Sequence, residues 1–402
     1  MKEESIVHSS LLERAGSLGV RLTGGPGGMR AISADLVFML MWKRFAELGG
    51  QNKITLLEAV SGASVPFTFW AAGMDAEAIQ RLHMETNYLD VLDFTAKLSD
   101  VVGRHWWELR RFKGKRPLTG RIDPNKFVAF IEQHVGHDAT TGEALWPQGF
   151  SCVACCEDEK SGKEFQVVFN GKGTYLRDNK GNIEANAPVR IGRAVAASCA
   201  IPLGFQPVEF KLSGGRTIFA FDGGMTDQGA IPLPSFQSVN GDDHKVHIIQ
   251  DVGEESGWKG YWDNKIYWVL CGGKCIPRWN AILEWLNLPH IGTEGRGKHV
   301  YILAPVDDIG GVEFDANADR KWLAEAGCFA RIGDKLMPFL TKESQAVVRL
   351  ASQELEKIRC KKDNGEEIFL KQKAVEIEAV FVKYGFYKTA SMPLAPAPAQ
   401  GK

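Results

Sequence analysis

The stretch ITLLEAVSGASVPFTFWAAG at residues 54–73 decides the fold. An apolar run breaks at Gly62 and then resumes, which is typical of a buried strand, a tight turn and a buried helix. Ser64 lies at this break, and its small neighbours Gly62 and Ala63 leave room for the strained backbone that such a turn needs. Because a turn of this kind projects a serine hydroxyl out of the chain path, Ser64 is a candidate nucleophile.

One residue departs from the Gly-x-Ser-x-Gly pattern of a nucleophile elbow, because Pro66 stands at its last position. Proline fits the first turn of a helix, but it favours an extended Val65, so we expect the helix to begin one residue late. Short turns of glycine and serine between apolar runs are common. An ordinary turn between a strand and a helix is therefore the alternative for this stretch.

Composition places the chain among ordinary globular proteins, since 44% of its 402 residues are hydrophobic and 24% are charged. The net charge of −1 argues against a general nucleic-acid binder, which needs a positive surface. The N-terminal segment is charged where a secretion signal is apolar, and the longest apolar stretch, residues 36–42, is far below the ~20 residues that cross a bilayer. With eight cysteines that fit reduced thiols, these features predict a cytoplasmic protein without a transmembrane helix.

A glycine-rich segment follows the first predicted strand, at residues 20–22. Residues 23–30 have the sequence TGGPGGMR, and a long apolar helix ending near Gly49 follows them. A glycine-rich turn from a strand to a helix directs several backbone N–H groups to one place, so it suits an anion. The segment lacks the Lys and Ser/Thr of a Walker loop, and a tight turn that needs positive φ is the alternative.

Two aromatic segments could contact a membrane surface. Residues 103–121 interleave Lys and Arg with tryptophan, and several tryptophans within residues 258–285 would suit a lid or a membrane-facing flap. The alternatives are a solvated loop for the first segment and a small packed subdomain for the second.

A cluster of cysteines raises the question of a metal site. Cys152, Cys155 and Cys156 lie close together, but no second Cys/His pair follows at the spacing of zinc ligands. Strand alternation would also point Cys155 and Cys156 to opposite faces. We therefore expect core thiols and no metal.

An acidic residue ends an apolar strand at residues 217–221. Asp222 is followed by Gly223 and Gly224, and burial beside phenylalanines would raise its pKa and make it a better proton acceptor. The alternative is a turn aspartate that binds its own backbone.

Taken together, the motifs GGMR at 27–30, GASVP at 62–66 and FDGG at 221–224, with AVAASCAIPLGFQPVEF at 194–210, resemble the patatin-like phospholipase family. The signature of that family has a Gly-Gly-x-Arg turn, a Gly-x-Ser-x-Gly elbow, an Ala-Ser-x-Ala-x-Pro segment and an Asp-Gly-Gly turn in this order. The resemblance covers about residues 17–340.

This resemblance implies a lipid acyl hydrolase of phospholipase A or lysophospholipase type, a serine carboxylic-ester hydrolase (EC 3.1.1) without a cofactor. In a Ser-Asp dyad, Ser64 would be the nucleophile and Asp222 the general base. It further implies an oxyanion hole and residues that support its loops, whereas Ser198 lies in a matching structural segment and we assign it no chemistry. The oxyanion hole would use the N–H groups of Gly27, Gly28 and Met29, and the loops would be supported by Arg30, Gly62, Gly223 and Gly224.

For the architecture we expect an α/β fold, a three-layer α/β/α sandwich with a mostly parallel central sheet. The predicted patatin-like domain covers residues 17–390, between an N-terminal extension at 1–16 and a disordered tail at 391–402. Within it we expect a helical cap at 75–146 and a tryptophan-rich insertion at 255–297.

Two prolines leave the activity open. Pro26 replaces the first glycine of the family's triple and Pro66 the last glycine of its elbow, so a displaced donor could lower the rate. The alternatives are an acyltransferase that uses an alcohol instead of water, a silent lipid-binding or regulatory protein, and a Ser-His-Asp hydrolase that uses His299. For the leading hypothesis we expect a phospholipid or other acyl-ester lipid as substrate, a peripheral membrane location and no nucleic acid.

Overall fold

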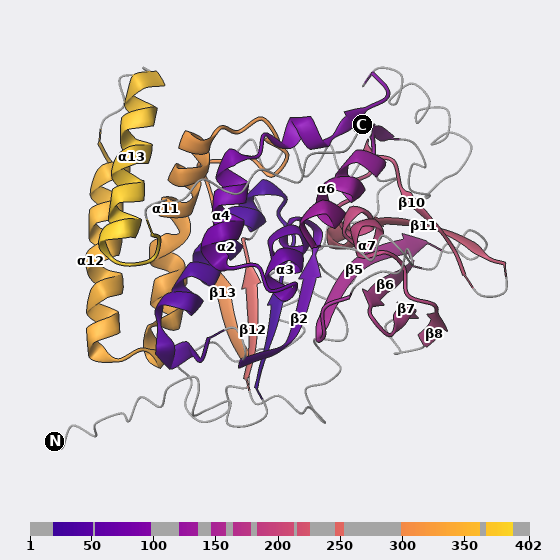
Figure 1. Ribbon diagram of the computed structural model, residues 1–402, viewed down its shortest axis with the longest axis horizontal. Coiled ribbons are helices and arrows are strands. Elements are labelled where there is room, and N and C mark those ends of the chain that lie inside the picture. Colours follow the sequence, from indigo (N-terminus) through magenta and orange to yellow (C-terminus); the bar gives the residue numbers. More distant parts are fainter. Residues whose placement is uncertain are drawn as a thin grey trace, which may run out of the picture.

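The fold is known from a computed structural model, shown in Figure 1. The N-terminal extension, residues 103–119, the tryptophan-rich insertion and the C-terminal tail lie outside the residues that it describes, so the predicted membrane contacts lie almost entirely outside them too. The structure describes residues 19–50, 53–97, 120–135, 146–157, 164–177, 183–212, 215–225, 246–252, 299–361 and 367–388.

Five parallel strands form the centre of the sheet, in the order β13-β12-β1-β2-β5. Strands in a parallel sheet are buried on both faces, which is why these strands are apolar; the side chains of Val20 and Leu22 in β1, for example, are wholly buried. The strands are β1 (Val20–Gly24), β2 (Ile54–Val60), β5 (Phe150–Glu157), β12 (Val246–Asp251) and β13 (His299–Leu303).

Beyond β5 the sheet becomes antiparallel. One edge of β5 pairs with β6 from Ser151 to Glu157, and its other edge pairs first with β2 and then with β11. A separate small sheet has the order β3-β4-β9. The added strands are β6 (Glu164–Asn170), β7 (Gly173–Arg177), β8 (Ile183–Asn186), β10 (Val208–Lys211) and β11 (Thr217–Asp222), and the small sheet contains β3 (Asp93–Phe94), β4 (Gly120–Asp123) and β9 (Leu203–Phe205).

Helix α2 (Met29–Arg44) is the central helix. Every residue from Met29 to Trp42 is buried, because the helix packs against β12 and against α3, α4 and α11. Figure 1 shows α11, α12 and α13 side by side next to β13, and β6 to β8 at the opposite edge of the sheet. The other helices are α3 (Ser64–Ala71), α4 (Ala76–Glu85), α6 (Asn125–Val135), α7 (Ile191–Ser198), α11 (Ala318–Leu336), α12 (Lys342–Arg359) and α13 (Glu367–Lys383).

The N-termini of helices α4 and α6 follow local sequence signals. Asp75 caps α4 by accepting the Glu77 N–H at 3.0 Å, and the Asp123 carboxylate accepts the Asn125 N–H at 2.8 Å where α6 begins. Two single-turn helices, η3 (Ser61–Ala63) and η4 (Tyr88–Val91), lie beside the site described below.

The predicted fold class is confirmed: the chain has an α/β fold with helices flanking a mostly parallel central sheet. No helix within the described ranges combines the length and the apolar character that a bilayer crossing requires.

Candidate active site

Strands β2 and β11 meet end to end on β5, and this register brings a serine to an aspartate. Val60, the last residue of β2, lies opposite Val153 of β5, and Asp222, the last residue of β11, lies opposite the next residue, Ala154. Because β2 is parallel and β11 antiparallel to β5, the two strands run toward each other. The residue that follows Val60 therefore lies next to Asp222, and that residue is Ser61.

Ser61 has the backbone conformation of a nucleophile elbow. Its φ is +54°, and no other non-glycine residue in the described part of the chain has a positive φ. Its hydroxyl donates a hydrogen bond to Asp222 Oδ2 at 2.6 Å. A strained serine between a strand and a helix, bonded directly to a carboxylate, is the arrangement expected of an activated hydroxyl.

Ser64 has different partners, and the expectation that its hydroxyl meets Asp222 is wrong. Ser64 lies one turn farther on, as the first residue of α3, and is completely buried. Its hydroxyl donates to Ser198 Oγ at 2.9 Å and accepts the Cys152 thiol at 3.4 Å. The reason is that β2 ends at Val60, so the turn places Ser61 at the elbow, three residues before Ser64.

Pro66 consequently lies in the first turn of α3 and outside the turn at Ser61. The structure begins α3 at Ser64, so the helix is not delayed beyond the proline. The first turn of a helix has N–H groups without intrahelical partners, and proline costs little there. This departure from the family pattern has no direct effect on Ser61.

Asp222 is where the sequence predicts it, at the end of β11 and 3% exposed. Burial raises its pKa from 3.8 to about 7, although hydrogen bonds from Ser61 and from the Gly224 N–H act in the opposite direction. The Gly224 N–H lies 2.7 Å from Oδ1. The carboxyl group thus titrates near neutral pH, which suits a general base.

The glycine turn packs directly against the elbow. A Cβ at Gly62 would lie 2.2 Å from the carbonyl oxygen of Gly28, and a Cβ at Gly28 would lie 2.0 Å from that of Gly311. Gly28 also has a φ of +57°. Only glycine fits at Gly62 and Gly28, where the backbones of the elbow, the glycine turn and Gly311 lie directly against one another.

The three expected oxyanion donors differ in their surroundings. The Met29 N–H is bonded to Gly311 O at 2.9 Å, which contradicts its assignment as a free donor in this conformation. The N–H groups of Gly27 and Gly28 have no acceptor among the described residues, and of these two glycines only Gly28 lines the pocket that contains Ser61. Gly28 is therefore the best placed of the three.

The supporting residues hold the loops together. Arg30 is buried, and its guanidinium donates to the carbonyl oxygens of Val306 at 2.8 Å and Val252 at 3.3 Å, so it ties the start of α2 to the segments after β12 and β13. Gly223 lies against Val153, and Gly224 against Pro26. Their role as supports of the site stays a prediction.

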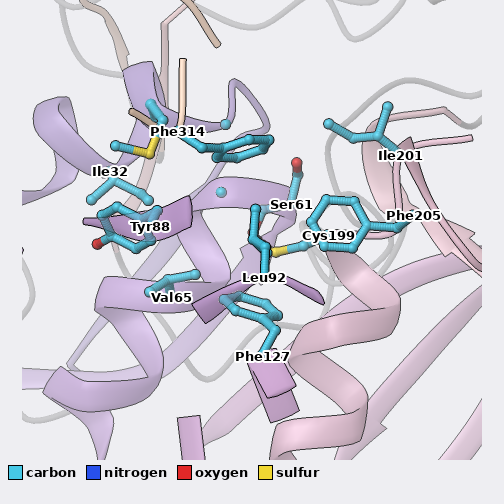
Figure 2. A pocket seen from close by; sticks show the side chains of 13 residues that line it. Ile32, Ser61, Val65, Tyr88, Leu92, Phe127, Cys199, Ile201, Phe205 and Phe314 are labelled. Atoms are coloured by element: carbon cyan, nitrogen blue, oxygen red, sulfur yellow. Dashed lines mark hydrogen bonds between the residues drawn. The ribbon is translucent and has the colours of Figure 1, made fainter. Parts of the chain in front are cut away.

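An apolar pocket opens beside Ser61, as Figure 2 shows. Its cavity volume is about 40 Å³, which is room for a few water molecules. Aromatic and aliphatic side chains share the wall, and Phe205 contacts both Phe127 and Phe314. The lining residues are Gly28, Met29, Ile32, Ser61, Gly62, Val65, Tyr88, Leu92, Phe127, Cys199, Ile201, Phe205 and Phe314.

The cysteines near the site are buried thiols. Cys152, Cys155 and Cys156 lie in β5 without disulfide partners, and burial raises the pKa of Cys152 to about 11. Within the described ranges, no group of three or more His, Cys, Asp or Glu side chains could hold a metal ion. Two further cysteines, Cys271 and Cys275, which are too few for a closed zinc site, and the side chain of His299 lie outside what the structure describes.

Sequence reasoning missed Ser61, although a signal for it exists. Residues 59–63, AVSGA, match the elbow pattern if alanine replaces both outer glycines, and Ser61 directly follows the apolar run of β2. The pocket residue Cys199 was also missed. Its thiol donates to the Ser61 carbonyl oxygen at 3.1 Å, a contact that no local pattern indicates.

Comparisons with known proteins identify similar structures and no similar sequence. No family model and no curated protein matches the sequence. Human GIVD cytosolic phospholipase A2 is 12% identical with a TM-score of 0.40, and the match covers 89% of this chain and 63% of that enzyme. VipD from Legionella pneumophila is 12% identical with a TM-score of 0.35, covering 94% of this chain and 82% of that one.

The type III effector protein ExoU, of Pseudomonas aeruginosa, is 12% identical with a TM-score of 0.39, covering 95% of this chain and 68% of that one. This chain thus spans less than two thirds of the length of the human enzyme. In its motifs the chain resembles the patatin-like phospholipases, and in its structure the glycine turn, the elbow and the Asp-Gly-Gly turn lie at one place.

Proposed function

We propose that this chain is a lipid acyl hydrolase that cleaves acyl esters through an acyl-serine intermediate, with Ser61 as nucleophile and Asp222 as general base. One observation carries the proposal: the Ser61 hydroxyl donates to Asp222 Oδ2 at 2.6 Å beside an apolar pocket. The proposal replaces the predicted Ser64 by Ser61 and keeps the predicted dyad chemistry.

In the first step Ser61 Oγ attacks the acyl carbonyl carbon while its proton passes to the Asp222 carboxylate. The carbonyl oxygen becomes an oxyanion beside the Gly28 N–H, which stabilises the negative charge. When this intermediate collapses, the bond between the acyl carbon and the leaving alcohol breaks. Asp222 returns the proton to the departing oxygen, and the acyl group stays on Ser61.

In the second step the same groups run in reverse. Asp222 takes a proton from a water molecule, which attacks the acyl carbon, and Ser61 recovers its proton when the ester bond breaks. An alcohol in place of water would give acyl transfer, so the nature of the acceptor separates a hydrolase from an acyltransferase.

The pocket supports a lipid as the substrate. Its wall is apolar and aromatic, with Val65 and Phe127 among its residues, and such a wall binds hydrocarbon by removing apolar surface from water. We therefore propose that this pocket widens to take the acyl chain of a phospholipid or lysophospholipid. Contact with the membrane through residues 103–121 or 258–285, at a cytoplasmic surface, stays part of this proposal.

Fatty-acid release from vesicles tests the proposal. The parent protein and a Ser61→Ala variant are incubated with phosphatidylcholine, phosphatidylethanolamine, phosphatidylglycerol and lysophosphatidylcholine, and free fatty acid is quantified by mass spectrometry. The parent should release fatty acid from at least one lipid, and Ser61→Ala should lower the rate by ~10³-fold or more. Equal release by both proteins would defeat the proposal.

A second candidate function is a lipid-binding or regulatory protein with a weak or silent site. The observation that favours it is the Met29 N–H, which is held by Gly311 O and so does not face an oxyanion. Vesicle binding by the parent, together with no release of fatty acid and no labelling of Ser61 by a fluorophosphonate, would establish it.

A further inference from the structure

Three consecutive residues, Ser198 to Ala200, contact the backbone of both members of the proposed dyad. Ser198 Oγ accepts the Ser61 N–H at 2.8 Å, and the Cys199 thiol donates to the Ser61 carbonyl oxygen at 3.1 Å. The Ala200 carbonyl oxygen accepts the Asp222 N–H at 2.9 Å. We call these three residues the 198–200 clamp.

The hydrogen bonds of Ser198 fix its role within the clamp. A serine hydroxyl has one donor and two acceptor positions. Ser198 donates to the Val153 carbonyl oxygen at 2.6 Å, so its two acceptor positions receive the Ser61 N–H and the Ser64 hydroxyl. Every position is used, and the side chain is completely buried, so Ser198 has a single arrangement.

Ser198 is bonded to strand β5, the strand on which β2 and β11 bring Ser61 and Asp222 together. Val153 lies opposite Val60, and the neighbouring Ala154 lies opposite Asp222. A hydroxyl bonded both to Val153 O and to the Ser61 N–H therefore holds the elbow at a fixed place relative to Asp222. The Ser61 N–H lies beyond the last residue of β2, where ladder pairing has ended, so Ser198 supplies its acceptor.

We propose that Ser198 is a positioning residue for the reaction: it holds Ser61 in the strained φ of +54° from which the hydroxyl reaches Asp222. This inference rests on the proposed function of Ser61. Without an acceptor on its N–H, the elbow relaxes toward negative φ, and Oγ moves away from the carboxylate and from Gly28.

The test separates the rate of acylation, which depends on the position of the Ser61 hydroxyl, from the stability of the fold. Ser198→Ala should lower kcat for a soluble short-chain ester, and the rate of Ser61 labelling by a fluorophosphonate, by ~10- to 100-fold, with KM nearly unchanged. Ser198→Thr keeps the hydroxyl and should restore both rates to within ~5-fold of the parent. If Ser198→Ala does not fold, Ser198→Cys, which keeps the volume but accepts hydrogen bonds weakly, should show the same loss.

Thr174→Val is the matched control, because it removes another buried hydroxyl, bonded to Ala187 O at 3.1 Å, on strand β7. It should lower the melting temperature but leave kcat and labelling unchanged. Labelling of Ser198→Ala within ~3-fold of the parent, or equal losses in Ser198→Ala and Thr174→Val, would overturn the inference. Activity that survives Ser61→Ala would instead overturn the proposed function.

Discussion

Ser61 and Ser64 lie three residues apart but differ in backbone conformation and in hydrogen-bond partners. Ser61 has a strained backbone, donates to a buried carboxylate and lines an apolar pocket, whereas Ser64 lies in a regular helix and donates to another hydroxyl. Both are nearly or fully buried, so burial does not separate them. What separates them is where each proton points, and this depends on where strand β2 ends.

The same comparison explains how one segment serves both serines. Ser198 accepts the backbone N–H of Ser61 and the side-chain hydroxyl of Ser64. One contact holds a reactive group in place, and the other completes a buried hydrogen-bond network. The two serines therefore differ in role although they share one hydrogen-bond partner: we expect changes around Ser61 to affect activity, and a change at Ser64 to affect mainly stability.

Asp222→Asn should have the largest effect, because it removes the proposed base but keeps the shape of the side chain. We expect kcat to fall by ~10³-fold, measured with a soluble ester. Near-parent activity in this variant would mean that Ser61 passes its proton to another group.

The same variant, Asp222→Asn, should lose activity but gain thermal stability at alkaline pH. The pKa of Asp222 is raised from 3.8 to about 7, so the folded state keeps a proton that the unfolded state has lost between these values. The parent is therefore destabilised as pH rises from about 4 to about 7, and fully so above pH 7. Asn carries no charge, and at pH 8 the melting temperature of Asp222→Asn should exceed that of the parent by ~2–5 °C in calorimetry.

Gly62→Ala should lower kcat by ~100-fold. Its Cβ would lie 2.2 Å from the Gly28 carbonyl oxygen, so the glycine turn must move away from Ser61. Gly73→Ala, at the other end of α3, is the control: φ is +92° but no atom lies within 4 Å, so stability falls and activity stays. Equal activity in the two variants would show that the glycine turn takes no part in the reaction.

The pH dependence should report Asp222 directly. Because the base acts in its unprotonated form, kcat/KM for a soluble ester should rise ~10-fold per pH unit below about 7 and level off above it. A midpoint near pH 4 would indicate an ordinary exposed carboxylate and would exclude Asp222 as the base.

Ser64→Ala should have the smallest effect on chemistry. The substitution removes a buried hydrogen bond to Ser198, so the melting temperature should fall by roughly a few degrees. We expect kcat to stay within ~3-fold of the parent. A loss as large as that of Ser61→Ala would make the two serines equivalent and remove the distinction.

Sequence reasoning predicted the features that depend on local pattern. The strands before Gly25 and Asp222, the cap at Asp75 and the α/β class follow from apolar runs and turn residues, and the structure has them. Asp222, the proposed general base, was singled out because an apolar strand ends in Asp-Gly-Gly. The long helix α11 was not singled out.

Features that depend on distant segments could not be predicted in the same way. Which serine takes the positive φ depends on how β2 and β11 share β5, and that register is set by pairing across the sheet. The Met29 N–H is occupied because Gly311, far along the chain, lies against the glycine turn. Pocket residues such as Cys199 and Phe314 likewise come together only in three dimensions.

Identification of the labelled serine tests the central claim most directly. The parent protein is treated with a fluorophosphonate, digested, and analysed by tandem mass spectrometry that resolves positions 61 and 64 within one peptide. Our account predicts phosphonylation of Ser61, no modification of Ser64, and no labelling in Ser61→Ala. Modification of Ser64 with Ser61 left free would contradict it.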